Sequence, residues 1–89
     1  MKITIKDNIF DVDVEDRKIL LNVNNGLYFE LNETGSILFD YIRQNEPTKK
    51  DIIAFIGKNF NLPEKLIEAD LNSFVKDMEN IDAIDKEND

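Results

Sequence analysis

The spacing of apolar residues changes near Asn32, and this change constrains the fold more than any other feature of the sequence. Before Asn32, apolar and polar residues alternate, which is typical of half-buried β-strands. After Asn32, apolar residues recur at steps of three and four, which is typical of amphipathic helices. The sequence therefore predicts strands followed by helices, which is the order of an α+β fold.

Three strands are expected in the first part of the chain. In the first strand pattern, Ile3 and Ile5 alternate with Lys and Thr. Phe10, Val12 and Val14 then alternate with acids that we expect to face water. A more deeply buried strand follows over 18–23. Asn24-Asn25-Gly26 predicts a hairpin turn, because Asn and Gly tolerate positive φ. The chain then returns as a third strand over 27–31.

Three helices are expected in the rest of the chain. The first covers 33–44, the second begins at Thr48, and the third and longest covers 63–81. Asn32 and Thr48 are good N-cap residues, and Pro63 suits the first position of a helix. The predicted fold is a three-stranded antiparallel β-meander followed by three helices, similar to a winged helix-turn-helix.

The length of 89 residues predicts a single domain over 1–84, and the acidic residues 85–89 are expected to be a frayed tail. The start of the chain lacks the long apolar core of a signal peptide. No stretch approaches the ~18 apolar residues that a membrane-spanning helix needs. We therefore expect a soluble, cytoplasmic protein without a membrane partner.

The composition argues against a catalytic, cofactor or metal site. The chain has no Cys and no His, so it lacks a thiol nucleophile, the commonest general base and the commonest metal ligand. Asp11, Asp13 and Glu15 alternate like Ca²⁺ ligands, but strand alternation explains this row, and the Gly and closing Glu of an EF-hand are missing. We expect no enzymatic activity from the chain alone.

The charge argues against nucleic acid and against an anionic membrane surface. Eleven basic residues are scattered among nineteen acidic ones, which gives a net charge of −8. Binding a polyanionic backbone requires a basic face. A neutral or basic partner fits this charge better.

Several segments in order carry a resemblance to a known family. They are ILLN at 19–22, LYFELNETG at 27–35, ILFDYI at 37–42, TKKDII at 48–53, FNL at 60–62 and ADLNSFV at 69–75. This ordered set resembles the PqqD-like family, the recognition element of ribosomally synthesised and post-translationally modified peptides. The resemblance spans about residues 9–84.

The resemblance implies a stand-alone adaptor, or peptide chaperone, that binds the leader segment of a precursor peptide. It further implies delivery of that peptide to a partner enzyme, either a leader peptidase of the lasso-peptide type or a radical SAM enzyme. No cofactor is implied for the adaptor itself. Because an open strand edge also pairs with its own copy, we expect a monomer or a weak dimer.

The predicted peptide site lies between the third strand and the third helix, where an extended peptide would add a fourth strand. The family resemblance supplies the strand, and helical periodicity supplies the helix face. The predicted peptide-binding residues are Leu27, Tyr28, Phe29, Glu30, Leu31, Leu66, Asp70, Ser73, Phe74 and Asp77. The acids suit a leader that carries Lys or Arg, and an exposed Leu66 suits an apolar anchor.

These residues also have simpler interpretations. Tyr28 and Phe29 are more often core residues than peptide contacts, and Asp70 fits an ordinary carboxylate on a helix surface. The alternative functions are an acidic winged-helix module that binds proteins, or a small transcriptional regulator. A regulator would need basic residues along its recognition helix. The third helix instead has Lys65 and Lys76 among a larger number of acids.

Overall fold

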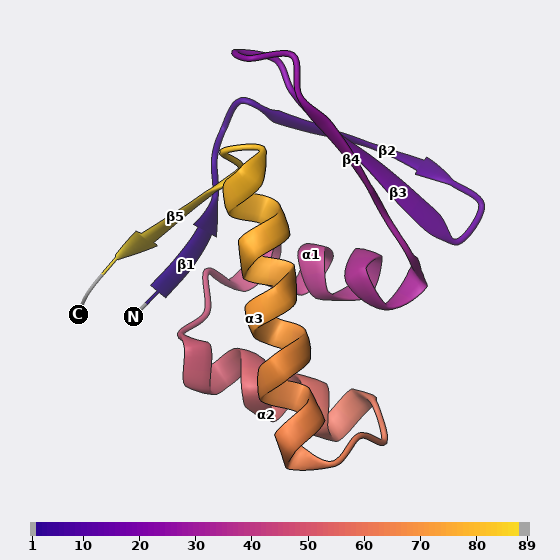
Figure 1. The fold of residues 1–89 in the computed structure, drawn as a ribbon, viewed down its shortest axis with the longest axis vertical. Coiled ribbons are helices and arrows are strands. Elements are labelled where there is room, and N and C mark those ends of the chain that lie inside the picture. The colour runs from indigo at the N-terminus through magenta and orange to yellow at the C-terminus, as the bar shows by residue number, and fades with distance from the viewer. Residues whose placement is uncertain (1, 88–89) are drawn as a thin grey trace.

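Residues 2–87 are described by a computed structural model, in which strands precede three helices and a short strand follows them (Figure 1). The elements are β1 (Lys2–Ile5), β2 (Ile9–Val14), β3 (Arg17–Asn22), β4 (Tyr28–Leu31), α1 (Glu33–Asn45), α2 (Lys49–Asn59), α3 (Glu64–Asn80) and β5 (Ile84–Glu87). Strands β2, β3 and β4 form an antiparallel sheet in that order. The predicted α+β class, a three-stranded meander followed by three helices, is confirmed.

The two ends of the chain form a second sheet that the sequence did not predict. Strand β1 pairs with β5 in antiparallel register, from Lys2↔Glu87 to Ile5↔Ile84. The prediction of a frayed tail is therefore wrong for 85–87, while 88–89 lie outside the described residues. Ile84 is buried, and the ladder to β1 satisfies backbone groups that a tail would leave to water.

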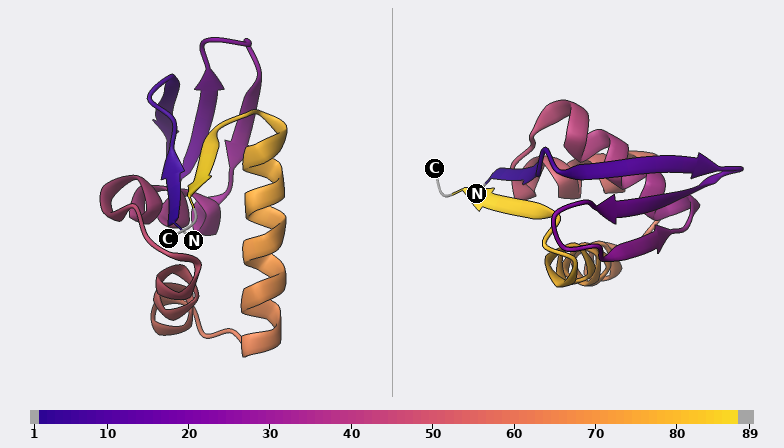
Figure 2. Two further views of the ribbon diagram at one scale, coloured as in Figure 1. Left: turned by 90° about the vertical axis from the view of Figure 1, so that its left-hand side faces the viewer. Right: turned by 90° about the horizontal axis from the view of Figure 1, so that it is seen from above.

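The core lies between the meander, β1 and the helices. Helix α1 packs against β1, β3 and β4, while α3 packs against α2 and β5. Seen from above, β4 is the strand of the meander nearest α3, and β2 lies on the far side (Figure 2). The largest fully buried apolar side chains are Ile3, Leu20, Phe39, Ile42, Ile52, Leu71 and Met78.

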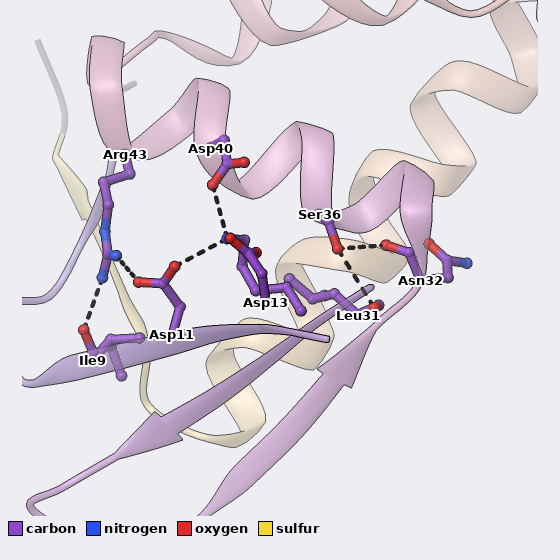
Figure 3. A network of polar contacts seen from close by, with 9 residues as sticks. Ile9, Asp11, Asp13, Leu31, Asn32, Ser36, Asp40 and Arg43 are labelled. Carbon is purple, nitrogen blue, oxygen red and sulfur yellow. Dashed lines mark hydrogen bonds and ion pairs between the residues drawn. The ribbon is translucent and has the colours of Figure 1, made fainter. Parts of the chain in front are cut away.

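The inner face of the meander is partly ionic. The side chain of Lys18 is only 3% exposed, and its ammonium group contacts carboxylates of Asp11 at 2.9 Å, Asp13 at 2.7 Å and Asp40 at 3.2 Å. Figure 3 shows the three acids converging on one place between β2 and α1. Burial alone would lower the pKa of Lys18, but the hydrogen bonds that its ammonium group donates to these carboxylates outweigh burial and raise that pKa above its usual value.

The predicted orientation of the second half of the first strand pattern is therefore wrong. The acids Asp11 and Asp13 face α1 because Lys18 binds them there. Alternation along β2 then puts the neighbouring apolar side chains outside. Phe10 and Val12 are 62% and 61% exposed, and together with residues of β3 they make the outer face of the meander apolar.

Arg43 extends the same network to the edge of the sheet. Its guanidinium donates hydrogen bonds to Asp11 and, at 2.7 Å, to the backbone oxygen of Ile9. It also lies 4.8 Å from the centre of the Phe39 ring, within the range of a cation–π contact. Burial would raise the pKa of Asp11, but hydrogen bonds from Lys18 and Arg43 lower it below its usual value.

We expect Lys18→Met to lower the free energy of unfolding by about 2–3 kcal/mol, because it leaves three acids without their shared cation. Urea titration measures the change. The matched control is Lys49→Met, which removes an exposed pair with Glu68 at 3.6 Å and should change stability by less than about 0.5 kcal/mol. Equal effects of the two substitutions would contradict a central role for Lys18.

The network also predicts how stability depends on pH. Because folding lowers the pKa of Asp11, its contribution is present above its unfolded value, near 3.8, and is lost as pH falls through the folded pKa. The stability difference between the wild type and Asp11→Asn should be constant near neutral pH and shrink below about pH 4. Urea titrations at several pH values measure this stability difference. A difference that keeps its full size down to the lowest pH would refute the stabilising role of ionised Asp11.

Candidate functional site: a groove between strand β4 and helix α3

A groove of about 410 Å³ opens between β4 and α3. Its apolar lining comes from β4, all three helices and the loop between α2 and α3, and consists of Phe29, Leu31, Leu38, Ile56, Phe60, Leu62 and Phe74. Its polar lining consists of Glu30, Asn32, Thr34, Asp70, Ser73 and Asp77, with Gly35 beside them. The groove therefore has an apolar lining with polar groups at β4, the start of α1 and α3.

The structure brings most of the predicted site residues together around this groove. Those that line it are Phe29, Glu30, Leu31, Asp70, Ser73, Phe74 and Asp77. Leu27, Tyr28 and Leu66 are exposed but do not line it. The Tyr28 side chain faces away because neighbouring residues of a strand point to opposite faces, and Phe29 points inward. Leu66 lies one helical turn before Asp70, beyond the end of the lining.

Sequence reasoning missed the groove residues from α1 and α2. Leu38 and Ile56 are buried apolar residues of α1 and α2, and helical periodicity cannot tell which core residue borders a groove. Gly35 shows how closely α1 starts against β4, since a Cβ atom there would lie 3.2 Å from Leu31 Cδ2. Asn32, the residue between these two elements, caps α1 by accepting a hydrogen bond from the Gly35 backbone.

The hydrogen-bond pattern fixes which backbone groups of β4 are free. The Asn22 N–H donates to the Leu27 oxygen at 2.9 Å, so the backbone N–H of Asn22 points toward β4. In the same register Leu20 pairs with Phe29, so the backbone groups of Phe29 face β3. The N–H and C=O groups of Tyr28 and Glu30 must then point away from β3, toward the open edge.

The opposite edge of the meander is less accessible. By the same alternation Ile9, Asp11 and Asp13 present their backbone groups at the β2 edge. There the Ile9 oxygen already accepts a hydrogen bond from Arg43, and the Ile9 N–H donates to Lys6. Within residues 2–87, no bond from another element reaches the backbone groups of Tyr28 or Glu30.

The groove is lined by few side chains that could act as a nucleophile, a general acid or base, or a metal ligand. Ser73 is its only hydroxyl on α3, and it stands between the carboxylates of Asp70 and Asp77 on one side of that helix. No set of three metal-ligating side chains is arranged to hold an ion in the part of the chain that the structure describes. No helix over 2–87 is long and apolar enough to cross a membrane. The arrangement suits binding of an extended, partly apolar chain.

The edge assignment is testable without a ligand. We expect the amide protons of Tyr28 and Glu30 to exchange with deuterium much faster than those of Phe29 and Leu31, because only the latter are bonded to β3. Residue-resolved NMR hydrogen exchange measures this alternation. Equal protection of all four amides would contradict the open edge.

Comparison with known proteins finds one matching family and solved structures with the same fold. The family described as Coenzyme PQQ synthesis protein D (PqqD) matches residues 17–84. Among solved structures, TbiB1 in complex with the TbiA(beta) leader peptide has a TM-score of 0.82 and 22% identity, covering 97% of this chain and 99% of that chain. Lasso peptide synthetase B1 complexed with the leader peptide has a TM-score of 0.79 and 15% identity, covering 97% of this chain and 100% of that chain. No curated protein sequence matches the chain.

Proposed function

This chain belongs to the PqqD family, and from that premise we propose that it binds the leader segment of a ribosomally made precursor peptide. The membership confirms the resemblance inferred from the sequence. The peptide would add a strand to β4 in the groove beside α3. Leader complexes of two structural relatives with the same fold support this proposal.

The observation that carries the proposal is the open edge of β4 beside an apolar groove. Tyr28 and Glu30 present their backbone groups at that edge, and an added strand would pair with both residues. Each main-chain hydrogen bond contributes about 1 kcal/mol net, so pairing at the edge supplies affinity that does not depend on the peptide sequence. The preference for one peptide sequence over another must then come from the peptide side chains that enter the groove.

The geometry assigns the two faces of such a peptide. A residue directly across from Phe29 would point to the same face as Phe29, which is the groove. Its neighbours along the peptide would point to the outer face, on the side of the Tyr28 side chain. Every second side chain of the peptide would therefore enter the groove, which Leu38, Phe74 and the polar groups of α3 line.

We further propose that the chain is a non-catalytic adaptor in the cytoplasm. In this role it would present the bound leader to a separate enzyme, a leader peptidase of the lasso-peptide type or a radical SAM enzyme. The absence of Cys and His from the sequence fits a binding role. The adaptor would act as a monomer or weak dimer, since a peptide on β4 occupies the edge through which two copies would pair.

Tyr28→Pro tests strand addition directly. Proline removes an N–H that faces the open edge but leaves the bonds between β3 and β4 intact, and edge strands tolerate it. We expect the affinity for a leader peptide to fall about tenfold or more. Calorimetric titration with the peptide from a short reading frame beside the gene measures this change.

The control is Tyr28→Ala, which removes the same side chain and keeps the N–H. Because the Tyr28 side chain is 73% exposed on the outer face, we expect this variant to bind nearly as well as the wild type. Thermal unfolding of both variants checks that the hairpin is intact. Unchanged binding by a folded Tyr28→Pro variant would rule out pairing at this edge.

A further inference from the structure

We propose that the groove selects an extended peptide that places a lysine or arginine against Asp70 and Asp77 as it passes α3. This inference rests on the proposed peptide binding and adds the chemistry of one preferred side chain. The recognised segment would combine an apolar residue over Phe29 and Phe74 with a basic residue at an adjacent groove-facing position.

The first observation is the charge of the lining. It includes Glu30, Asp70 and Asp77 but no Lys or Arg. Glu30 is already paired, since its carboxylate lies 2.7 Å from Arg17. Asp70 and Asp77 therefore dominate the charge that a bound peptide would meet on the α3 side.

The second observation is the arrangement of charge around α3. Asp77 follows Asp70 by seven residues, about two turns, so both carboxylates lie on one side of the helix. Lys65 and Lys76 lie about 140° and 120° around the helix from Asp70 and do not line the groove. The basic residues of this helix are thus kept away from the groove.

The third observation is that these two acids have no cation of their own. Within residues 2–87, no ion pair involves Asp70 or Asp77. Other acids of α3 and its surroundings are paired, and examples are Asp82 with Lys6, Glu68 with Lys49 and Glu79 with Lys86. Asp77 is also half-buried, so screening by water and salt is weaker there than at a free surface.

The spacing of an extended peptide fits this pair of acids. Groove-facing residues of a strand recur every ~6.8 Å, while two helical turns separate Asp70 and Asp77 by ~10.5 Å. One long basic side chain of the peptide, lying between Asp70 and Asp77, can reach both carboxylates. Two successive groove-facing residues of the peptide also fit within the distance between these two acids. The aliphatic part of Lys or Arg would pack on Phe74 while its charge meets the acids.

A selection experiment tests this inference without knowledge of the natural ligand. A displayed library of random dodecapeptides is selected on the wild-type chain and, in parallel, on the double variant Asp70→Asn/Asp77→Asn. We expect Lys and Arg to be enriched at one register of alternate positions with the wild type and not with the double variant. Changing that basic residue to Met in a selected peptide should weaken binding about fivefold to tenfold.

The matched control is Glu68→Gln/Glu79→Gln, which removes two charges from the same helix outside the groove lining and should keep the basic preference. If peptides are selected through β4 without a basic preference, or if the preference persists in Asp70→Asn/Asp77→Asn, this inference is overturned and strand addition stands. If no peptide is retained, or if Tyr28→Pro retains the same peptides equally, both the inference and the proposed function are overturned.

Discussion

The buried ammonium group of Lys18 determines how the meander sits on helix α1. Its carboxylate partners come from β2 and from α1, so the acidic side of β2 has to face the helix. An unpaired ammonium in this place would be costly, because the side chain is almost fully removed from water. The apolar residues of β2, such as Phe10 and Val12, are left on the outer face as a consequence.

The same packing makes the two edges of the sheet unequal. Arg43 lies on the last turn of α1, where it binds Asp11 and donates a hydrogen bond to the backbone oxygen of Ile9 at the β2 edge. Strand β4 lies at the opposite edge, next to α3, and the backbone groups of Tyr28 and Glu30 stay open there. A sheet whose β2 edge is partly occupied at Ile9 and whose β4 edge is open favours strand addition at β4.

Local signals in the sequence were sufficient to predict the helices. Asn32 caps α1, and Thr48 forms a full capping box with Asp51, so both helix starts follow from interactions within four residues. The hairpin at Gly26 is equally local, since this residue has a φ of 76°. The periodicity of α3 also placed Asp70 and Asp77 on one side of the helix.

Features that depend on distant residues could not be predicted in the same way. The pairing of β1 with β5 joins the two ends of the chain. The residue pattern of neither strand indicates which other strand it pairs with. The orientation of β2 depends on a buried Lys18, although alternating acids usually indicate a solvated face. In the groove, Leu38 and Ile56 were recognisable as apolar helix residues, but only the packing of three helices shows that they border it.

The most direct test of strand addition at β4 is an NMR structure of the labelled chain with a bound leader peptide, read through contacts between peptide and protein protons. Strand addition predicts cross-strand contacts from the peptide backbone to Tyr28 and Glu30, together with contacts from alternate peptide side chains to Phe74 and α3. Contacts to the β2 edge, or to the outer face around Phe10 and Val12 with none to β4, would contradict it.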